Sequence, residues 1–144
     1  MNSVVLTQSQ ARKIILHAAG LSKPGQFGKG KEAVLKLINH LGFVQIDTNY
    51  VVERAHHHAI VSRVPNYKPE WLDQLQAEGK VFEFWTYATG YIPMHDFRFS
   101  LPVKAGFLSR RKPLTQTESN LMRKVLDRIS REGPLMAISP VRST

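Results

Sequence analysis

The chain has 144 residues, of which 42% are hydrophobic, so it can form one globular domain or one domain and the start of a second. It has no cysteine, which excludes disulfides and thiolate metal sites, and no apolar run approaches the roughly 18 residues of a membrane span. Its 20 Lys and Arg residues outnumber 11 Asp and Glu residues, and the net charge of +9 favours a nucleic-acid partner. We therefore expect a soluble, cytoplasmic, nucleoid-associated protein, with a merely basic surface as the alternative.

Two helices are expected at the start of the chain. Thr7-Gln8-Ser9-Gln10 is a capping-box pattern, and apolar residues at helical spacing follow it up to a stop at Gly20. The glycine-rich segment 22–30 lacks the spacing and the preceding strand of a phosphate-binding loop, so we expect an ordinary loop there. A second helix is predicted over 31–41, and Gly42 suits the left-handed position that ends it.

A short strand with two polar residues is predicted next, over 43–47. Its alternation puts Gln45 and Asp47 on the same side of an extended segment. An amide and a carboxylate so placed can hold and activate a water, and the carboxylate can stabilise an oxocarbenium cation. The residues alone favour a plainer reading, in which Asp47 caps a turn and Gln45 is a surface residue.

Residues 48–63 show no clear pattern and are left unassigned, but they contain His56-His57-His58. In a strand, His56 and His58 would share a face and could supply two metal ligands. No third ligand is obvious nearby, so we expect neither a metal nor a cofactor. The two histidines are predicted to contact DNA or to lie on the surface, and Arg54 and Arg63 are predicted phosphate contacts.

A short helix over 69–79 and a strand pair are expected to complete a first domain at 1–93. The strands are predicted over 81–87 and 89–92, with a turn at or before Gly90. Two or three helices followed by a strand pair is the order of a winged helix, an α+β fold, although periodicity alone does not distinguish it from other small α+β domains. About half of the strand aromatics should pack inside, and the rest could stack on an extruded base. These aromatic residues are Phe82, Phe84, Trp85, Tyr87 and Tyr91.

The last third of the chain divides into a connector and a helix. Residues 94–114 are basic and punctuated by prolines, which favours an arm that contacts DNA phosphates. The basic residues predicted to do so are Lys104, Arg110, Arg111 and Lys112. A second capping box opens an amphipathic helix over 115–132, which must bury its apolar stripe against the first domain, a second copy or further protein.

Several ordered blocks resemble the N-terminal part of the YcaQ-like group of DNA glycosylases, which is related to AlkZ. The resemblance runs from about residue 9 to about residue 136, and its blocks are residues 43–48, 51–58, 62–67, 82–85 and 91–98. It implies tandem winged-helix domains that excise alkylated purines, notably N7-alkylguanine, and unhook interstrand crosslinks. Residues 115–144 would then be the start of a truncated second winged helix.

The resemblance also implies roles for the polar pair of the short strand. The Gln-x-Asp motif of this branch matches Gln45-Ile46-Asp47, whereas the AlkZ-like branch carries Gln-x-Gln. Gln45 would position a water, and Asp47 would activate it or stabilise the oxocarbenium cation. The implied partner is double-stranded DNA that carries alkylated or crosslinked guanine.

Two features depart from the family pattern. Relatives commonly read Trp-Thr-His or Trp-Ala-His after the aromatic strand, whereas the third residue here is Tyr87, which does not titrate near neutrality. A non-catalytic winged-helix DNA-binding protein is therefore the alternative function. Family chains are also more than twice as long, and residues 138–144 leave the pattern, so we expect a truncated paralogue produced by a frameshift or an early stop.

Overall fold

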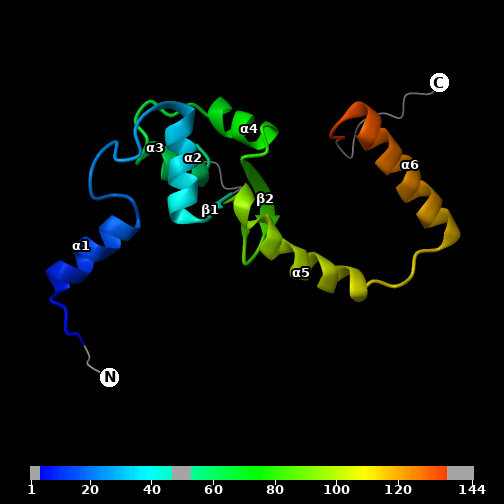
Figure 1. Cartoon of the computed structure of the whole chain (residues 1–144), viewed down its shortest axis with the longest axis horizontal. Coiled ribbons are helices and arrows are strands. Elements are labelled where there is room, and N and C mark those ends of the chain that lie inside the picture. The colour runs from blue at the N-terminus through cyan, green and yellow to red at the C-terminus, as the bar shows by residue number, and fades with distance from the viewer. Residues whose placement is uncertain (1–3, 47–52, 136–144) are drawn as a thin grey trace. The chain divides into compact units, whose positions relative to one another are not determined.

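The computed structural model describes residues 4–46 and 53–135, so the predicted catalytic Asp47 lies outside the described residues. The chain divides into two compact units, Met1–Lys104 and Ala105–Thr144. The described residues form six α-helices, one short 3-10 helix and a three-stranded antiparallel sheet (Figure 1). The expected α+β class is therefore confirmed. The division between these two compact units falls after Lys104.

The first two helices begin and end where their sequence signals predict. Helix α1 (Gln8–Ala18) has the Thr7 capping box, in which the Thr7 hydroxyl accepts a bond from the Gln10 amide. Helix α2 (Gly30–Leu41) ends at Gly42, whose φ of 71° is a left-handed conformation that glycine adopts without a side-chain clash. The buried residues of α2 are Ala33, Val34, Leu37 and Ile38.

The sheet is built from three short strands, β1 (Val44–Gln45), β2 (Val81–Trp85) and β3 (Thr89–Pro93). Their order in the sheet is β1-β3-β2, so β3 is central and β1 is an edge strand. Helices α2 and α4 (Glu70–Ala77) pack against one face of this sheet (Figure 1). The core therefore lies between that face and the helices.

A single hydrophobic core holds the first unit together. Its largest fully buried side chains come from α2, α3 (Ala55–Val61), α4 and the strands, and include Leu37, Ile38, Ile60, Leu72, Leu75 and Val81. Burying one such side chain contributes roughly 1.5–3 kcal/mol. Helix α1 has no buried residue and is attached mainly through its end, where the His40 ring lies 2.9 Å from the Ala18 carbonyl oxygen.

The histidine segment is a helix, α3 (Ala55–Val61), and not the strand considered from the sequence. Residues two apart on a helix are rotated by roughly 200°, so His56 and His58 cannot share a face. His56 is 3% exposed and belongs to the buried side, whereas His58 is exposed. The two-ligand arrangement on a strand face is therefore wrong.

The predicted irregular connector is largely helical. A 3-10 helix, η1 (Met94–Asp96), leads directly into α5 (Phe97–Ser109), which contains Pro102 in its interior. Proline removes one backbone donor but does not end this helix. Residues 110–115 form a turn, a bend and irregular backbone between α5 and the next helix.

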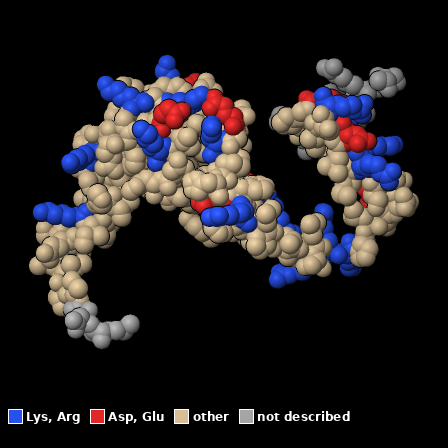
Figure 2. Space-filling model, in the orientation of Figure 1, with Lys and Arg blue, Asp and Glu red and all other residues tan. Residues whose placement is uncertain are grey.

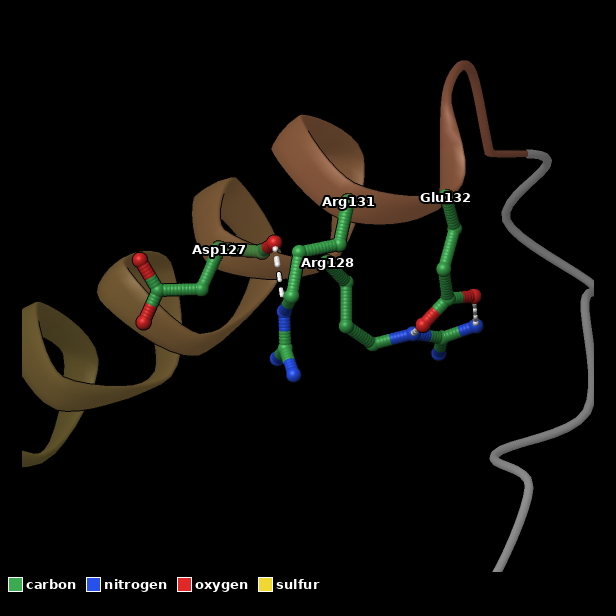
Figure 3. A network of polar contacts seen from close by, with 4 residues as sticks. All are labelled: Asp127, Arg128, Arg131 and Glu132. Atoms are coloured by element: carbon green, nitrogen blue, oxygen red, sulfur yellow. Dashed lines mark hydrogen bonds and ion pairs between the residues drawn. The ribbon is translucent and has the colours of Figure 1, made fainter.

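The second unit contains the long helix α6 (Gln116–Glu132), which has the predicted capping box between Thr115 and Glu118. Figure 3 shows its last turns, where the Arg128 guanidinium donates to both Glu132 carboxylate oxygens, at 3.0 and 2.9 Å. Arg131 Nε donates to the backbone carbonyl of Asp127, while the Asp127 carboxylate points away. The apolar stripe of α6 is exposed, as its members Leu121, Met122, Val125, Leu126 and Ile129 show. Within the described ranges, no helix is long and apolar enough to cross a membrane.

Candidate functional site

The site starts at Gln45, the last residue of the edge strand β1. Its neighbour Val44 is buried in the core, so Gln45 is exposed, as the alternation predicted. A pocket of about 300 Å³ opens beside it, between the end of α2, β1 and α3. The pocket is lined by Leu41, Phe43, Val44, Gln45, Ala55, Ala59 and Arg63. Gln45 and Arg63 are the two long polar side chains in that lining, against an otherwise apolar wall.

Arg63 links the end of α1 to the end of α3. Its Nε donates to the Ala19 carbonyl at 2.7 Å, and its Nη1 donates to the Ala59 carbonyl at 2.7 Å and to the Ser62 hydroxyl at 3.0 Å. Burial lowers the pKa of the Arg63 guanidinium, but arginine remains charged at neutral pH. A cation is therefore fixed at the wall of the pocket that contains Gln45, and it also anchors the end of α1.

The β2–β3 turn brings Tyr87 to the same region. The Tyr87 ring lies 5.1 Å from the Phe43 ring, centroid to centroid, and Phe43 lines the Gln45 pocket. Tyr87 is 77% exposed. Tyr87, which replaces the expected histidine, therefore packs on Phe43 in the wall of the pocket that Gln45 also lines.

A pair that the sequence did not single out lies next to α3. His57 Nδ1 is 2.8 Å from the Tyr67 hydroxyl, and the two rings are 5.7 Å apart. Burial raises the pKa of Tyr67, and the nearby Tyr91 and acidic residues raise it further, so the hydroxyl keeps its proton and can donate to His57. The two residues are ten apart in the sequence, and no spacing rule links them, so the contact is seen only in the fold.

The residues predicted to bind DNA fall into separate places. Arg54 and His58 are exposed near the start and the end of α3, whereas His56 is buried and offers no ring face to a phosphate. Lys104 lies in the first unit, over aromatic rings of the sheet and of α5. The remaining three, Arg110, Arg111 and Lys112, are exposed in the second unit, and Figure 2 shows Lys and Arg side chains along this part of the chain.

No group of three or more His, Asp or Glu side chains suited to a metal ion occurs in residues 4–46 and 53–135. The groups gathered around the pocket are an amide, a guanidinium and aromatic rings. Such groups can orient water, contact a phosphate and stack on a base.

Comparison with known proteins assigns the chain to a family. A family model described as DNA glycosylase AlkZ-like matches residues 38–138, more than two thirds of the chain. The match includes Gln45, Asp47, the pocket residues and the β2–β3 hairpin. No solved structure matches the chain. The resemblance inferred from the sequence blocks is thereby confirmed, and the chain belongs to the AlkZ-like family of DNA glycosylases.

Proposed function

We propose that the protein is a DNA glycosylase-like protein that excises N7-alkylated purines or unhooks interstrand crosslinks. The observation that carries the proposal is the position of Gln45, exposed at a strand edge beside a pocket and inside the family match. Asp47 follows two residues later in the sequence. A membrane or small-molecule role has no comparable support.

The chemistry needs few protein groups. N7 alkylation leaves a positive charge on the guanine, so the bond between N9 and the sugar C1′ is already weakened. When it breaks, the electron pair goes to N9 and the base leaves as a neutral molecule. A water bonds to C1′ and gives its proton to a carboxylate, which is the role proposed for Asp47. Gln45 would hold that water, and the Arg63 cation would favour a phosphate close to the pocket.

A winged-helix arrangement is proposed for the first unit. Support comes from the element order, in which α2, β1, α3 and α4 precede the β2–β3 hairpin. Double-stranded DNA is the proposed partner, with phosphate contacts at the exposed Arg54, His58 and residues 110–112 and at the half-buried Lys104. Such a partner would locate the protein at the nucleoid in the cytoplasm.

A non-catalytic DNA-binding protein is the second candidate, and Tyr87 favours it. Tyr87 occupies the position where relatives commonly carry histidine, and it lies beside the Phe43 wall of the pocket. A phenol does not exchange protons near neutral pH, so one proton-transfer group would be missing. DNA binding would then persist without base release.

A base-release assay separates the two candidates. The full chain is incubated with duplex DNA that carries N7-methylguanine, beside Gln45→Ala and the matched control Gln74→Ala, which is exposed on α4. We expect the wild type and Gln74→Ala to release the base and Gln45→Ala to release it at least about tenfold more slowly. Retention of DNA without release by any protein would support the non-catalytic candidate.

A further inference from the structure

The face of the sheet that is turned away from α2 and α4 carries a row of aromatic and polar side chains. Gln45 pairs with Gly90 across β1 and β3, and Phe84 pairs with Gly90 across β3 and β2. Directly paired residues point to the same face of a sheet. Gln45 and Phe84 therefore flank Gly90 on one face, which we call the outer face.

Two pairs of aromatic rings lie on this outer face. The Phe43 ring occupies the space where a side chain of Gly90 would lie, and Tyr87 packs on Phe43 with 5.1 Å between ring centroids. On the other side of Gly90, the Phe84 ring is 6.3 Å from Phe82. These two ring pairs, Tyr87 with Phe43 and Phe84 with Phe82, lie on either side of Gly90, and together we call them the aromatic strip.

A single cation sits on this strip. Lys104 of α5 holds its ammonium 5.5 Å from the centroid of the Phe84 ring and 4.2 Å from that of Phe97. Phe97 itself packs edge-on against Phe82. The first part of α5 therefore folds back on the outer face and supplies a positive charge next to exposed ring surface.

The strip is not the hydrophobic core. The strands contribute core residues, such as Val81 and Tyr91, from the opposite face of the sheet. On the outer face, Phe43, Phe82 and Phe84 are only half-buried, and Tyr87 is exposed. Aromatic surface that the core does not need is free to bind a ligand.

Charge identifies the kind of ligand. A row of rings beside a cation is the arrangement that binds nucleotides without sequence preference, since bases stack on the rings and a phosphate approaches the cation. The first turn of α4, on the helical side of the unit, contains Glu70 and Asp73. Figure 2 shows acidic side chains among Lys and Arg side chains over the helices of the first unit.

We propose that the aromatic strip binds unstacked nucleobases of DNA, with the exposed Tyr87 ring as the stacking platform and Lys104 as the contact for the adjacent phosphate. The proposal rests on the proposed function, because it specifies how a DNA partner would be held at the Gln45 site. It predicts a preference for DNA with unpaired bases over fully paired duplex. Tyr87 then has a binding role whether or not the protein is a catalyst.

The test compares two DNA probes that differ only at their centre. One is a fully paired duplex, and the other has a short single-stranded gap that contains 2-aminopurine, whose fluorescence falls when it stacks. The full chain is titrated with each probe as wild type, Tyr87→Ala and Tyr87→Phe, with Phe107→Ala as the control for an exposed aromatic residue. Lys104→Gln is compared with Lys36→Gln, an exposed lysine on α2.

We expect the wild type to bind the gapped probe about tenfold more tightly and to quench 2-aminopurine. Tyr87→Ala should lose both effects but keep its affinity for duplex, while Tyr87→Phe and Phe107→Ala should behave as the wild type. Lys104→Gln should weaken binding of the gapped probe more than Lys36→Gln does. Equal affinity for both probes, or quenching that persists in Tyr87→Ala, would contradict base stacking on the aromatic strip but would leave the proposed DNA function intact. Failure to bind either probe would contradict the proposed function itself.

Discussion

The ring of Phe43 fills the space in which a side chain of residue 90 would lie, and residue 90 is glycine. Strand β1, which ends at Gln45, therefore packs closely on the central strand β3 at a residue that has no side chain. A Cβ at Gly90 would lie 2.9 Å from the Val44 carbonyl oxygen and closer still to two Phe43 ring carbons. Gly90 also pairs with Gln45. The position of Gln45 beside its pocket therefore depends on glycine at residue 90.

Gly90→Ala should destabilise the first unit by about 1–3 kcal/mol, because the added carbon overpacks against backbone as well as ring atoms. The measurement is the free energy of unfolding in denaturant, with Gly106→Ala as the control. A Cβ at Gly106 in α5 meets nothing within 4 Å, so that variant should be neutral or stabilised by up to about 1 kcal/mol. Equal stability of the two variants would contradict the close approach of Phe43 to Gly90.

Arg63→Gln should loosen α1 from the first unit. The bond from Arg63 to the Ala19 carbonyl is lost, and α1 has no buried residue to hold it. Since the guanidinium is only partly buried, we expect a loss of about 1–2 kcal/mol and faster trypsin cleavage at Arg12 or Lys13. Arg54→Gln, an exposed arginine at the start of α3, serves as the control. Equal cleavage of the two variants would show that Arg63 does not anchor α1.

Acid should weaken the start of α6. The Thr115 backbone and hydroxyl donate to Glu118, and these bonds lower the pKa of Glu118 below its ordinary value of 4.5. Because the folded pKa is lowered, the stabilisation is fully present above 4.5 and is lost as the pH falls through the lowered pKa. A circular dichroism titration should show a loss of helix in this acid range that is smaller in Glu118→Gln. The same loss in both proteins would exclude the capping carboxylate as its cause.

Tyr87→His tests the departure from the family pattern. A histidine beside Phe43 would titrate near neutrality and could exchange a proton at the pocket, so base release should rise by at least about tenfold. Its rate should depend on pH around roughly 6.5, the ordinary pKa of histidine. Tyr87→Phe keeps an aromatic ring that does not titrate near neutrality, so its rate of base release should not rise above that of the wild type. Indistinguishable pH–rate profiles of the two variants would argue against a proton-transfer role at residue 87.

The helix boundaries could be predicted because their signals are local. Thr7 and Thr115 each cap a helix with a partner three residues away, and Gly42 ends α2 through its own conformation. Helix α3 was not predicted, since it is short, contains three histidines and has no side-chain cap. Residues 94–114 were predicted to be an arm because they are basic and contain prolines, but α5 continues through Pro102.

The candidate site could be predicted only in part, because only some of its features have local signals in the sequence. Strand alternation predicted that Gln45 and Asp47 lie on the same side of a strand, and the resemblance to the family's Gln-x-Asp motif marked this pair as the candidate site. The bond from Arg63 to Ala19 joins residues 44 apart, and the contact of Lys104 with Phe84 joins α5 to β2. Such contacts depend on packing between distant segments, so neither spacing nor periodicity reveals them.

The most direct test of the account is the rate of N7-methylguanine release from duplex DNA by the wild type and by Asp47→Asn. Asp127→Asn is the control, because the Asp127 carboxylate is exposed on α6. We expect the wild type and Asp127→Asn to release N7-methylguanine, and Asp47→Asn to release it at a rate at least about 100-fold lower. Release at equal rates by Asp47→Asn and the wild type, or by neither protein, would contradict the catalytic role of Asp47.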